Sequence, residues 1–269
     1  MSSHLSPEMS RRSRSFEAWA LEYDRYRPSY PDGLFDQIAT RLSLPTVPVV
    51  ADLGAGTGKA ALAMARRGSQ VIAVEPGEGM LDVLRARAST EGLNVDTRLS
   101  SAEDTGLPEA SVDLVTVAQA FHWFDKARAV REMARIVRPG GGVAIFWNAR
   151  ADDRSPFLAG HMAVLGKYVP EDHIDHRAKD DESSTQTDLS EGGFFDVDPR
   201  LILRHEVAMT VDDFVHYAFT ASYVRLFVEP DDQDRLRAEL LEQAREYAVD
   251  GKVTVELDVD VYVGRRNSA

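Results

Sequence analysis

Short apolar runs alternate with helical patterns between Val49 and Asn148. The strand candidates span residues 46–54, 70–76, 95–101, 111–119 and 141–148. The helix candidates span residues 59–68, 79–92 and 125–141, the first two ending in glycine. Continuous apolar strands separated by helices predict a parallel sheet covered on both faces. Because such crossovers are right-handed, we expect a doubly wound α/β fold.

Outside this region the pattern is different. Before it, a helical pattern begins at Phe16, and a second helix carries Leu34, Ile38 and Leu42 on one face. After it, residues 150–193 are mixed, with an acidic, Ser/Thr-rich centre that predicts a loop or lid. The remaining elements that we expect are a strand at 199–210, a helix at 210–227 capped by Thr210 or Asp212, a charged helix from Asp231 to Val249, and an alternating strand at 253–265 in an edge or antiparallel position.

Composition narrows the class of protein. The 269 residues include no cysteine, which excludes a disulfide framework, a thiolate zinc site and a cysteine nucleophile. The start of the chain has no apolar region typical of a secretory signal, and no apolar run is long enough to span a membrane. The net charge of −13 disfavours nucleic acid as a partner. We therefore expect a cytoplasmic enzyme or binding protein.

The turn after the first strand is the strongest chemical signal. Asp52 and Leu53 end the strand, Gly54, Gly56 and Gly58 follow, and a helix begins at once. Glycines there allow positive φ, and the helix N-terminus favours an anionic group. A phosphate-binding loop is excluded because Leu53 replaces its first glycine and Ala60 its Ser or Thr. The dinucleotide pattern is also broken, because Gly58 comes one residue early.

Glu75 ends the second strand, 21 residues after Gly54. A carboxylate in this position can accept hydrogen bonds from both hydroxyls of a ribose. It would repel a 2′-phosphate. An exposed strand-end carboxylate is the alternative interpretation.

Four motifs in this order resemble the class I S-adenosylmethionine-dependent methyltransferases: ADLGAGTGK, VIAVEP, SAED at Ser101–Asp104, and REMARIVRPGGGVAIFWN. The resemblance covers about residues 16–148 and, more loosely, the rest. The segments YDRYRPSYP, AQAFHWFD, GFFDVDP and TASYVRLF are similar to the small-molecule branch that includes trans-aconitate methyltransferases. The resemblance implies a mostly parallel seven-stranded sheet (a Rossmann-like methyltransferase fold), an N-terminal helical segment and an inserted cap.

This resemblance also implies a division of the chain. We expect a flexible tail at 1–15, a cofactor-binding core with N-terminal helices at 16–149, a substrate cap with a sixth strand at 150–230, and a final helix and strand at 231–269.

The residues that would bind S-adenosyl-L-methionine follow from the same resemblance. The turn would hold the methionine end through Gly54, Ala55, Gly56, Thr57 and Gly58, with Asp52 near the ammonium group. Glu75 would bind the ribose, and the adenine would lie against Pro76, Met80, Ala102 and Glu103. Gln119 would lie where the substrate enters. Tyr23, Arg27 and Tyr30 would cover the cofactor, and the substrate would contact Tyr30, Phe121, Trp123 and Tyr223.

His122 is the candidate catalytic residue. A phenol, hydroxyl or amine acceptor needs a general base, whereas a carboxylate is already ionised at neutral pH. A histidine that orients its turn is the alternative interpretation. Trp123 and Phe124 could line the pocket or anchor the following helix, and Asp52 could cap the glycine turn.

Two further patterns have less specific meanings. His173 and His176 form an H-x-x-H spacing without a third ligand, so we expect no metal. Phe219, Tyr223 and Phe227 form one helical face, which fits core packing and substrate contact equally well.

The sequence thus predicts a methyltransferase that acts on a small molecule, most simply at a carboxylate or hydroxyl oxygen. A cofactor-binding protein of the same fold without methyl transfer is the alternative, as is C- or N-methylation of a secondary metabolite. Nucleic-acid methylation is a third and weaker option. The acceptor and the oligomeric state cannot be deduced from the pattern.

Overall fold

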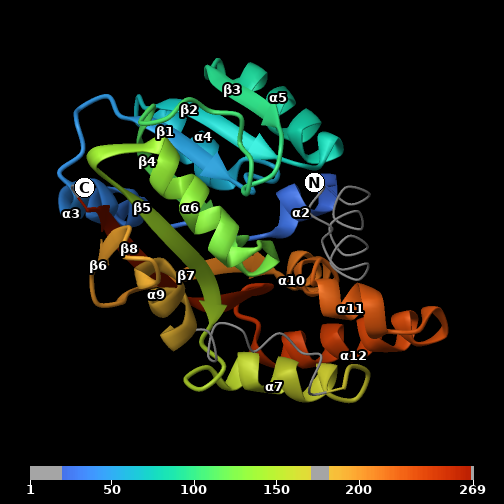
Figure 1. Cartoon of the computed structure of the whole chain (residues 1–269). Coiled ribbons are helices and arrows are strands. Elements are labelled where there is room, and N and C mark those ends of the chain that lie inside the picture. Colours follow the sequence, from blue (N-terminus) through green and yellow to red (C-terminus); the bar gives the residue numbers. More distant parts are fainter. Residues whose placement is uncertain (1–19, 171–181, 268–269) are drawn as a thin grey trace.

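In the computed structural model, which describes residues 20–170 and 182–267, eight strands form one mixed sheet (Figure 1). Its order is β3-β2-β1-β4-β5-β8-β6, and β7 also pairs with β8. The strands are β1 (Val49–Leu53), β2 (Gln70–Glu75), β3 (Val95–Leu99), β4 (Val112–Ala118), β5 (Val137–Arg150), β6 (Phe195–Val197), β7 (Leu201–Thr210) and β8 (Lys252–Arg266).

The first five strands are parallel, and β8 runs antiparallel to β5, β6 and β7. The chain builds outward from β1 to β3, returns to β4 beside β1, and continues to β5 on the other side. The direction of winding therefore reverses between β1 and β4. Ligands of open α/β sheets bind at the carboxyl ends of the strands at such a reversal.

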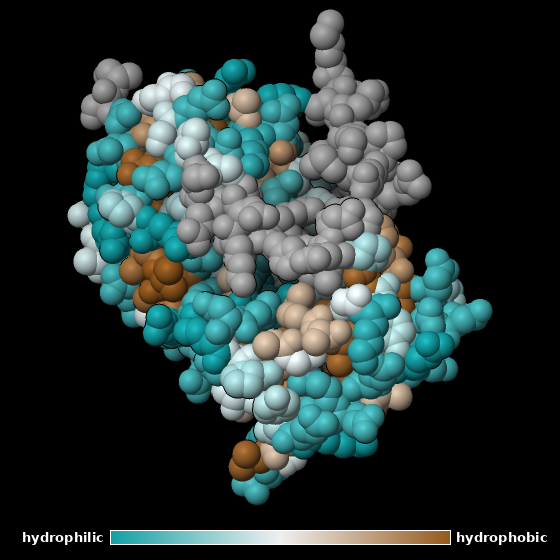
Figure 2. All heavy atoms as spheres, turned by 90° about the horizontal axis from the view of Figure 1, so that it is seen from below, coloured by the Kyte–Doolittle hydropathy of each residue, from teal (hydrophilic) through white to brown (hydrophobic). Residues whose placement is uncertain are grey.

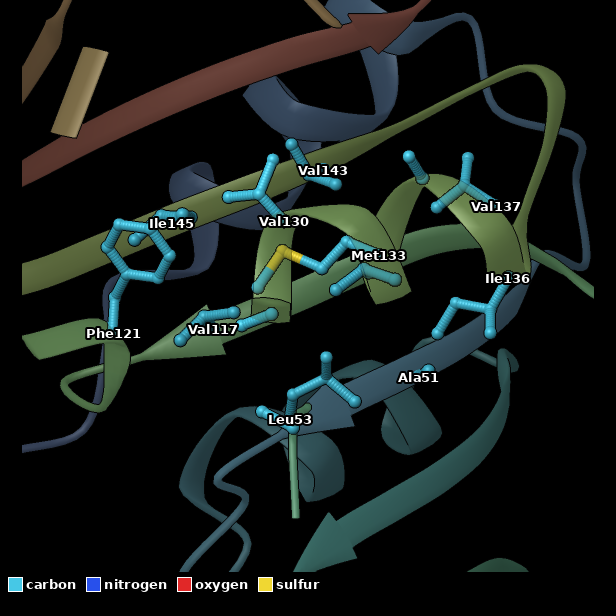
Figure 3. Close-up of a cluster of buried hydrophobic side chains, with 14 of the residues drawn as sticks. Ala51, Leu53, Val117, Phe121, Val130, Met133, Ile136, Val137, Val143 and Ile145 are labelled. Atoms are coloured by element: carbon cyan, nitrogen blue, oxygen red, sulfur yellow. The ribbon is translucent and has the colours of Figure 1, made fainter. Parts of the chain in front are cut away.

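Helices cover both faces of the sheet, as expected for a doubly wound fold. On one face lie α3 (Asp32–Leu42), α4 (Lys59–Arg66) and α5 (Glu78–Glu91). On the other lie α6 (Lys126–Ile136) and α9 (Glu182–Ser190). In Figure 3, Val130, Met133 and Ile136 of α6 face the sheet residues Val117 and Val143.

A second group of helices packs beyond the end of β5 (Figure 1). It contains α7 (Pro156–Leu165), α10 (Val211–Phe219), α11 (Ser222–Phe227) and α12 (Pro230–Tyr247), which we call the cap helices. The N-terminal helix α2 (Ala20–Tyr26) contacts α10, where the Tyr26 and His216 rings stack with centroids 4.6 Å apart. Seen from the side of α7 and α12, the described surface is mainly hydrophilic, with apolar side chains in separate small groups (Figure 2).

The structure confirms the α/β class and differs from the expected elements in detail. The sheet has eight strands rather than seven because β6, only three residues long, is too short to show a pattern. The expected helix at 210–227 begins at Val211 and is capped by Thr210, whose hydroxyl accepts from the Asp213 amide, but it breaks at Thr220–Ala221. The final strand is antiparallel, as one of the two alternatives expected, and lies inside the sheet.

Helix α9 lies in the acidic, Ser/Thr-rich stretch where we expected a loop or lid, and α7 lies in the mixed residues before it. The tail at 1–15 and the pair His173 and His176 lie outside the described residues. Within residues 20–170 and 182–267, no cluster of three potential metal ligands is present. No helix in that part of the chain is long and apolar enough to cross a membrane.

Candidate functional site

A pocket opens at the carboxyl ends of β1, β2 and β4, at the reversal point of the sheet. Its walls come from the glycine turn, the end of β2, the segments after β3 and β4, and the N-terminal segment. The lining residues are Tyr23, Tyr30, Gly54, Ala55, Gly56, Thr57, Lys59, Ala60, Glu75, Pro76, Met80, Ser101, Ala102, Glu103, Ala118, Gln119, Ala120, Trp123 and Phe124. Thirteen of the residues expected at the site are among them.

The glycine turn is held in a conformation that ordinary residues avoid. Gly54, Gly56 and Gly58 have φ values of 66°, 53° and 86°. A Cβ on Gly54 would lie 2.6 Å from the Ala120 Cβ, and one on Gly58 would lie 2.7 Å from the Leu84 Cγ. Glycine is therefore required at these two positions both for φ and for the close approach of neighbouring segments. Gly58 packs against Leu84 and does not line the pocket.

Glu75 connects two backbone turns at the floor of the pocket. Its Oε2 accepts from the Gly56 amide and its Oε1 from the Gly77 amide, both at 2.9 Å. Each carboxylate oxygen has a second lone pair, so the side chain can accept further hydrogen bonds from a ligand.

Asp52 lies beneath the turn and outside the pocket lining. Its carboxylate is 1% exposed, accepting from the Ala61 amide at 3.1 Å and the Thr116 hydroxyl at 2.7 Å. This geometry matches the capping alternative, in which the side chain joins β1, β4 and the start of α4. Burial raises the pKa of Asp52 to about 7, although both hydrogen bonds oppose the increase.

This pKa makes stability depend on pH in a direction that can be measured. An aspartate in the unfolded chain titrates near pH 4, so between about pH 4 and 7 the folded state holds a proton that the unfolded state has lost. The free energy of unfolding therefore falls as pH rises through this window. We expect the free energy of unfolding of the wild type, measured by urea denaturation relative to that of Asp52→Asn, to fall by about 2 kcal/mol from pH 5 to pH 7.

The matched control is Asp153→Asn, whose side chain is 65% exposed. Its stability should follow the wild type across the same pH range. Parallel curves for Asp52→Asn and the wild type would contradict the assigned pKa.

Gln119 occupies the end of β4 with φ of 62°, in the left-handed region that glutamine rarely adopts. Its amide donates to the Phe146 carbonyl at 3.0 Å and its Nε2 to the Asn148 carbonyl at 3.3 Å. Backbone strain of this kind persists only where the surroundings hold it, and it concentrates at functional sites.

Two tyrosines of the N-terminal segment close one side of the pocket. Burial raises the pKa of Tyr23, and it raises that of Tyr30 well above the ordinary range. Both are therefore neutral phenols at physiological pH. Arg27 does not line the pocket; it packs over the Tyr23 and Tyr217 rings and donates to the Thr220 hydroxyl at 2.8 Å. It thereby anchors α2 to α10.

Lys59 lines the pocket and was not among the expected site residues. Its Nζ donates to the Asp24 carbonyl at 2.7 Å, and burial lowers its pKa to about 8. Its position in the sequence could have predicted this, because Lys59 is the first residue of α4 and follows the glycine turn directly. Ala60, Ser101, Ala118 and Ala120 were also missed.

Three expected substrate or catalytic residues lie elsewhere. Phe121 is fully buried in the core between α6 and the sheet (Figure 3). The Tyr223 hydroxyl accepts from Arg150 at 3.0 Å within the cap helices. His122 lies on the short helix η1 (Phe121–Trp123) outside the lining, with its ring 4.6 Å from that of Trp123.

The pocket has features that fit S-adenosylmethionine. The Thr57 hydroxyl oxygen is buried at the turn and has no hydrogen-bond partner among the described residues. Buried polar groups without partners are rare, and a polar ligand group at the turn would satisfy this one. Met80 and Ala102, both nearly fully buried, offer an apolar surface suited to an adenine ring.

Comparisons with known proteins agree with this geometry. Residues 51–145 match a family described as a methyltransferase domain. An uncharacterized methyltransferase of Mycobacterium tuberculosis is 44% identical over 157 residues, which are 58% of this chain and 60% of that protein. An uncharacterized methyltransferase of Schizosaccharomyces pombe is 35% identical, over 57% of this chain and 60% of that protein.

Solved structures share the fold over nearly the whole chain. A provisionally named type II methyltransferase from Anaeromyxobacter dehalogenans aligns with a TM-score of 0.61 and 25% identity, covering 90% of this chain and 98% of that one. A geranyl diphosphate C-methyltransferase from Streptomyces coelicolor aligns with a TM-score of 0.56 and 14% identity, covering 98% and 100%.

The architecture is therefore the Rossmann-like methyltransferase fold. Together with the matched domain, it supports the expected class, the class I S-adenosylmethionine-dependent methyltransferases. The chain spans about 60% of the length of the first curated relatives that it matches.

Proposed function

We propose that this protein is an S-adenosylmethionine-dependent methyltransferase acting on a small molecule, with a carboxylate or hydroxyl oxygen as the acceptor. The observation that carries the proposal is the pocket at the reversal point of the sheet. There the glycine turn, the Glu75 carboxylate and Gln119 with its positive φ line one continuous cavity. The methyltransferase domain at 51–145 includes all three.

Each wall of the pocket suits one part of the cofactor. The bare backbone at Gly54 and Gly56, with the Thr57 hydroxyl, would hold the methionine end. Glu75 would accept from the two ribose hydroxyls while keeping its bonds to the Gly56 and Gly77 amides. These contacts orient a bound nucleoside without any change in the turn.

When bound, S-adenosylmethionine would supply a methyl carbon made electrophilic by its positively charged sulfur, which would leave as a neutral thioether when the methyl group is transferred. The chain contributes position, because alignment alone can supply up to about 7–11 kcal/mol in favourable systems. Tyr23 and Tyr30 exclude water from one side and offer neutral hydroxyl donors. Gln119 also lines the cavity, and its side-chain Nε2 donates to the Asn148 carbonyl.

A carboxylate acceptor requires no general base, so His122 matters only for a hydroxyl, phenol or amine. With a hydroxyl acceptor, we expect His122→Ala to lower kcat by about a hundredfold or more, since general bases contribute 10²–10⁴. With a carboxylate acceptor, the same variant should retain its activity. Rates measured across pH 6 to 9 with both acceptor types separate these cases, and unchanged turnover with both would remove His122 from catalysis.

The fold alone does not determine the reaction. The cyclase SpnF, a [4+2]-cyclase, shares the fold with a TM-score of 0.53 and 18% identity. Other neighbours are a C-methyltransferase and a phosphoethanolamine-type N-methyltransferase. A cofactor-binding protein without methyl transfer is therefore the second candidate. The net charge of −13 favours a small molecule over nucleic acid as the substrate.

Two measurements test the proposal. Isothermal calorimetry with S-adenosylhomocysteine should show saturable binding to one site. Incubation with methyl-labelled S-adenosylmethionine and panels of carboxylic acids, alcohols, phenols and amines should then release S-adenosylhomocysteine with at least one acceptor. Tight binding without turnover on any panel would favour the second candidate, and no binding would overturn both.

A further inference from the structure

Arg150, the last residue of β5, has its charge buried beneath the cap helices, and a carboxylate pairs with its Nε only. Its side chain is only 15% exposed. Nη1 donates to the Tyr223 hydroxyl at 3.0 Å, Nη2 to the Met162 sulfur at 3.1 Å, and Nε to Asp152 at 3.3 Å. A thioether is a poor acceptor. The edge formed by Nη1 and Nη2, which could bind an oxyanion through two hydrogen bonds, therefore faces two neutral groups.

The position of Arg150 connects it to the pocket. Alternate residues of a strand face the same side, so Phe146, Asn148 and Arg150 lie in a row on one face of β5. Tyr30, which lines the pocket, packs against Phe146 with ring centroids 4.8 Å apart. The Asn148 carbonyl accepts from Gln119. Arg150 comes about 7 Å further along the strand, toward the cap helices.

The surroundings of Arg150 suit an anion. His161 is 1% exposed, and its Nδ1 has no hydrogen-bond partner among the described residues. Burial and the nearby Arg150 charge lower the pKa of His161 to about 3, so this imidazole is neutral and can donate one hydrogen bond. Arg27, a second cation, lies over the ring of Tyr217 in α10. Asp152 is the carboxylate paired with Arg150.

We propose that Arg150 binds an anionic group of the methyl acceptor, at a point remote from the methylated atom. The ligand chemistry is a carboxylate or phosphate oxyanion, which takes the Nη1–Nη2 edge in place of Met162 and receives a further hydrogen bond from His161. A desolvated guanidinium gains most from a partner of full opposite charge. The inference rests on the proposed methyl transfer, because it requires the acceptor to enter beside Gln119.

The test measures binding of defined probes to the full chain saturated with S-adenosylhomocysteine. The probes are glutarate, glycerol 2-phosphate and the neutral glutaramide, and the readouts are the thermal midpoint and calorimetric affinity. We expect at least one anion, but not glutaramide, to raise the midpoint of the wild type. The anion that binds more tightly identifies the carboxylate or phosphate source. Arg150→Met should weaken this binding about tenfold or more.

Controls separate a specific site from general charge effects and from misfolding. Arg204→Met removes an arginine that is 75% exposed and should bind the anion as the wild type does. Arg150→Lys keeps the charge without the forked edge and should also bind at least several-fold more weakly. Retained affinity for S-adenosylhomocysteine shows that a variant is folded. If Arg150→Met does not fold, the anion affinity of Arg150→Lys tests the inference instead.

Either of two results would overturn the inference: no anion binds the wild type, or the affinity persists in the Arg150 variants that fold. If the wild type does not bind S-adenosylhomocysteine, the proposed function is refuted instead. The two failures are therefore distinguishable in one experiment.

Discussion

Replacing Glu75 with Ala should lower the affinity for S-adenosylhomocysteine roughly ten- to hundredfold, the largest expected effect on binding. The carboxylate would lose its hydrogen bonds to the ribose, and hydrogen bonds to a charged group contribute about 1.5–3 kcal/mol. The Gly56 and Gly77 amides would also lose the side chain that joins their turns. Calorimetry on the folded variant measures the change.

Glu75→Gln is the matched variant, because it retains one oxygen acceptor and the side-chain volume. We expect its affinity to lie between those of the wild type and Glu75→Ala. Unchanged affinity in the alanine variant would show that the ribose is not bound at Glu75, even if the cofactor still occupies the pocket.

Replacing Gly54 with Ala should cause the largest loss of stability at the turn. The new Cβ would lie 2.6 Å from the Ala120 Cβ and 3.2 Å from the Phe124 ring, at φ of 66°. The left-handed conformation costs an L-residue about 1–2 kcal/mol, and overpacking adds roughly 1–3 kcal/mol. We therefore expect the free energy of unfolding, measured in urea, to fall by about 2–5 kcal/mol.

Gly56→Ala separates the two contributions. Gly56 also has a positive φ, 53°, but a Cβ there would meet no atom within 4 Å. This variant should lose only the conformational part, about 1–2 kcal/mol. Equal losses at the two positions would mean that the close approach of Ala120 contributes nothing to the requirement for glycine at Gly54.

Much of the fold and part of the candidate site could be predicted because their determinants are local. The run of apolar residues before Gly54 and the helix after Gly58 specify a strand, a turn and a helix within about twenty residues. Thr210 capped its helix for the same reason, since the acceptor and the Asp213 amide are neighbours in sequence. The short β6 carried no such pattern and became a strand only by pairing with β8.

The role of individual side chains depended on contacts between distant segments. Asp52 follows the expected motif, yet Thr116 of β4, 64 residues away, holds it beneath the turn. Phe121 and Tyr223 are drawn into the cores beneath α6 and within the cap helices.

Local pattern by itself determined the order of strands and helices between Val49 and Asn148, the glycine turn and the carboxylate at the end of β2, since backbone conformation and periodicity are properties of short segments. Only the tertiary structure decided that Lys59 faces the pocket, that Asp52 does not, and that the Arg150 charge is buried beside Tyr223. Burial and pairing of a side chain depend on which remote elements pack against it, and that packing is a property of the whole chain.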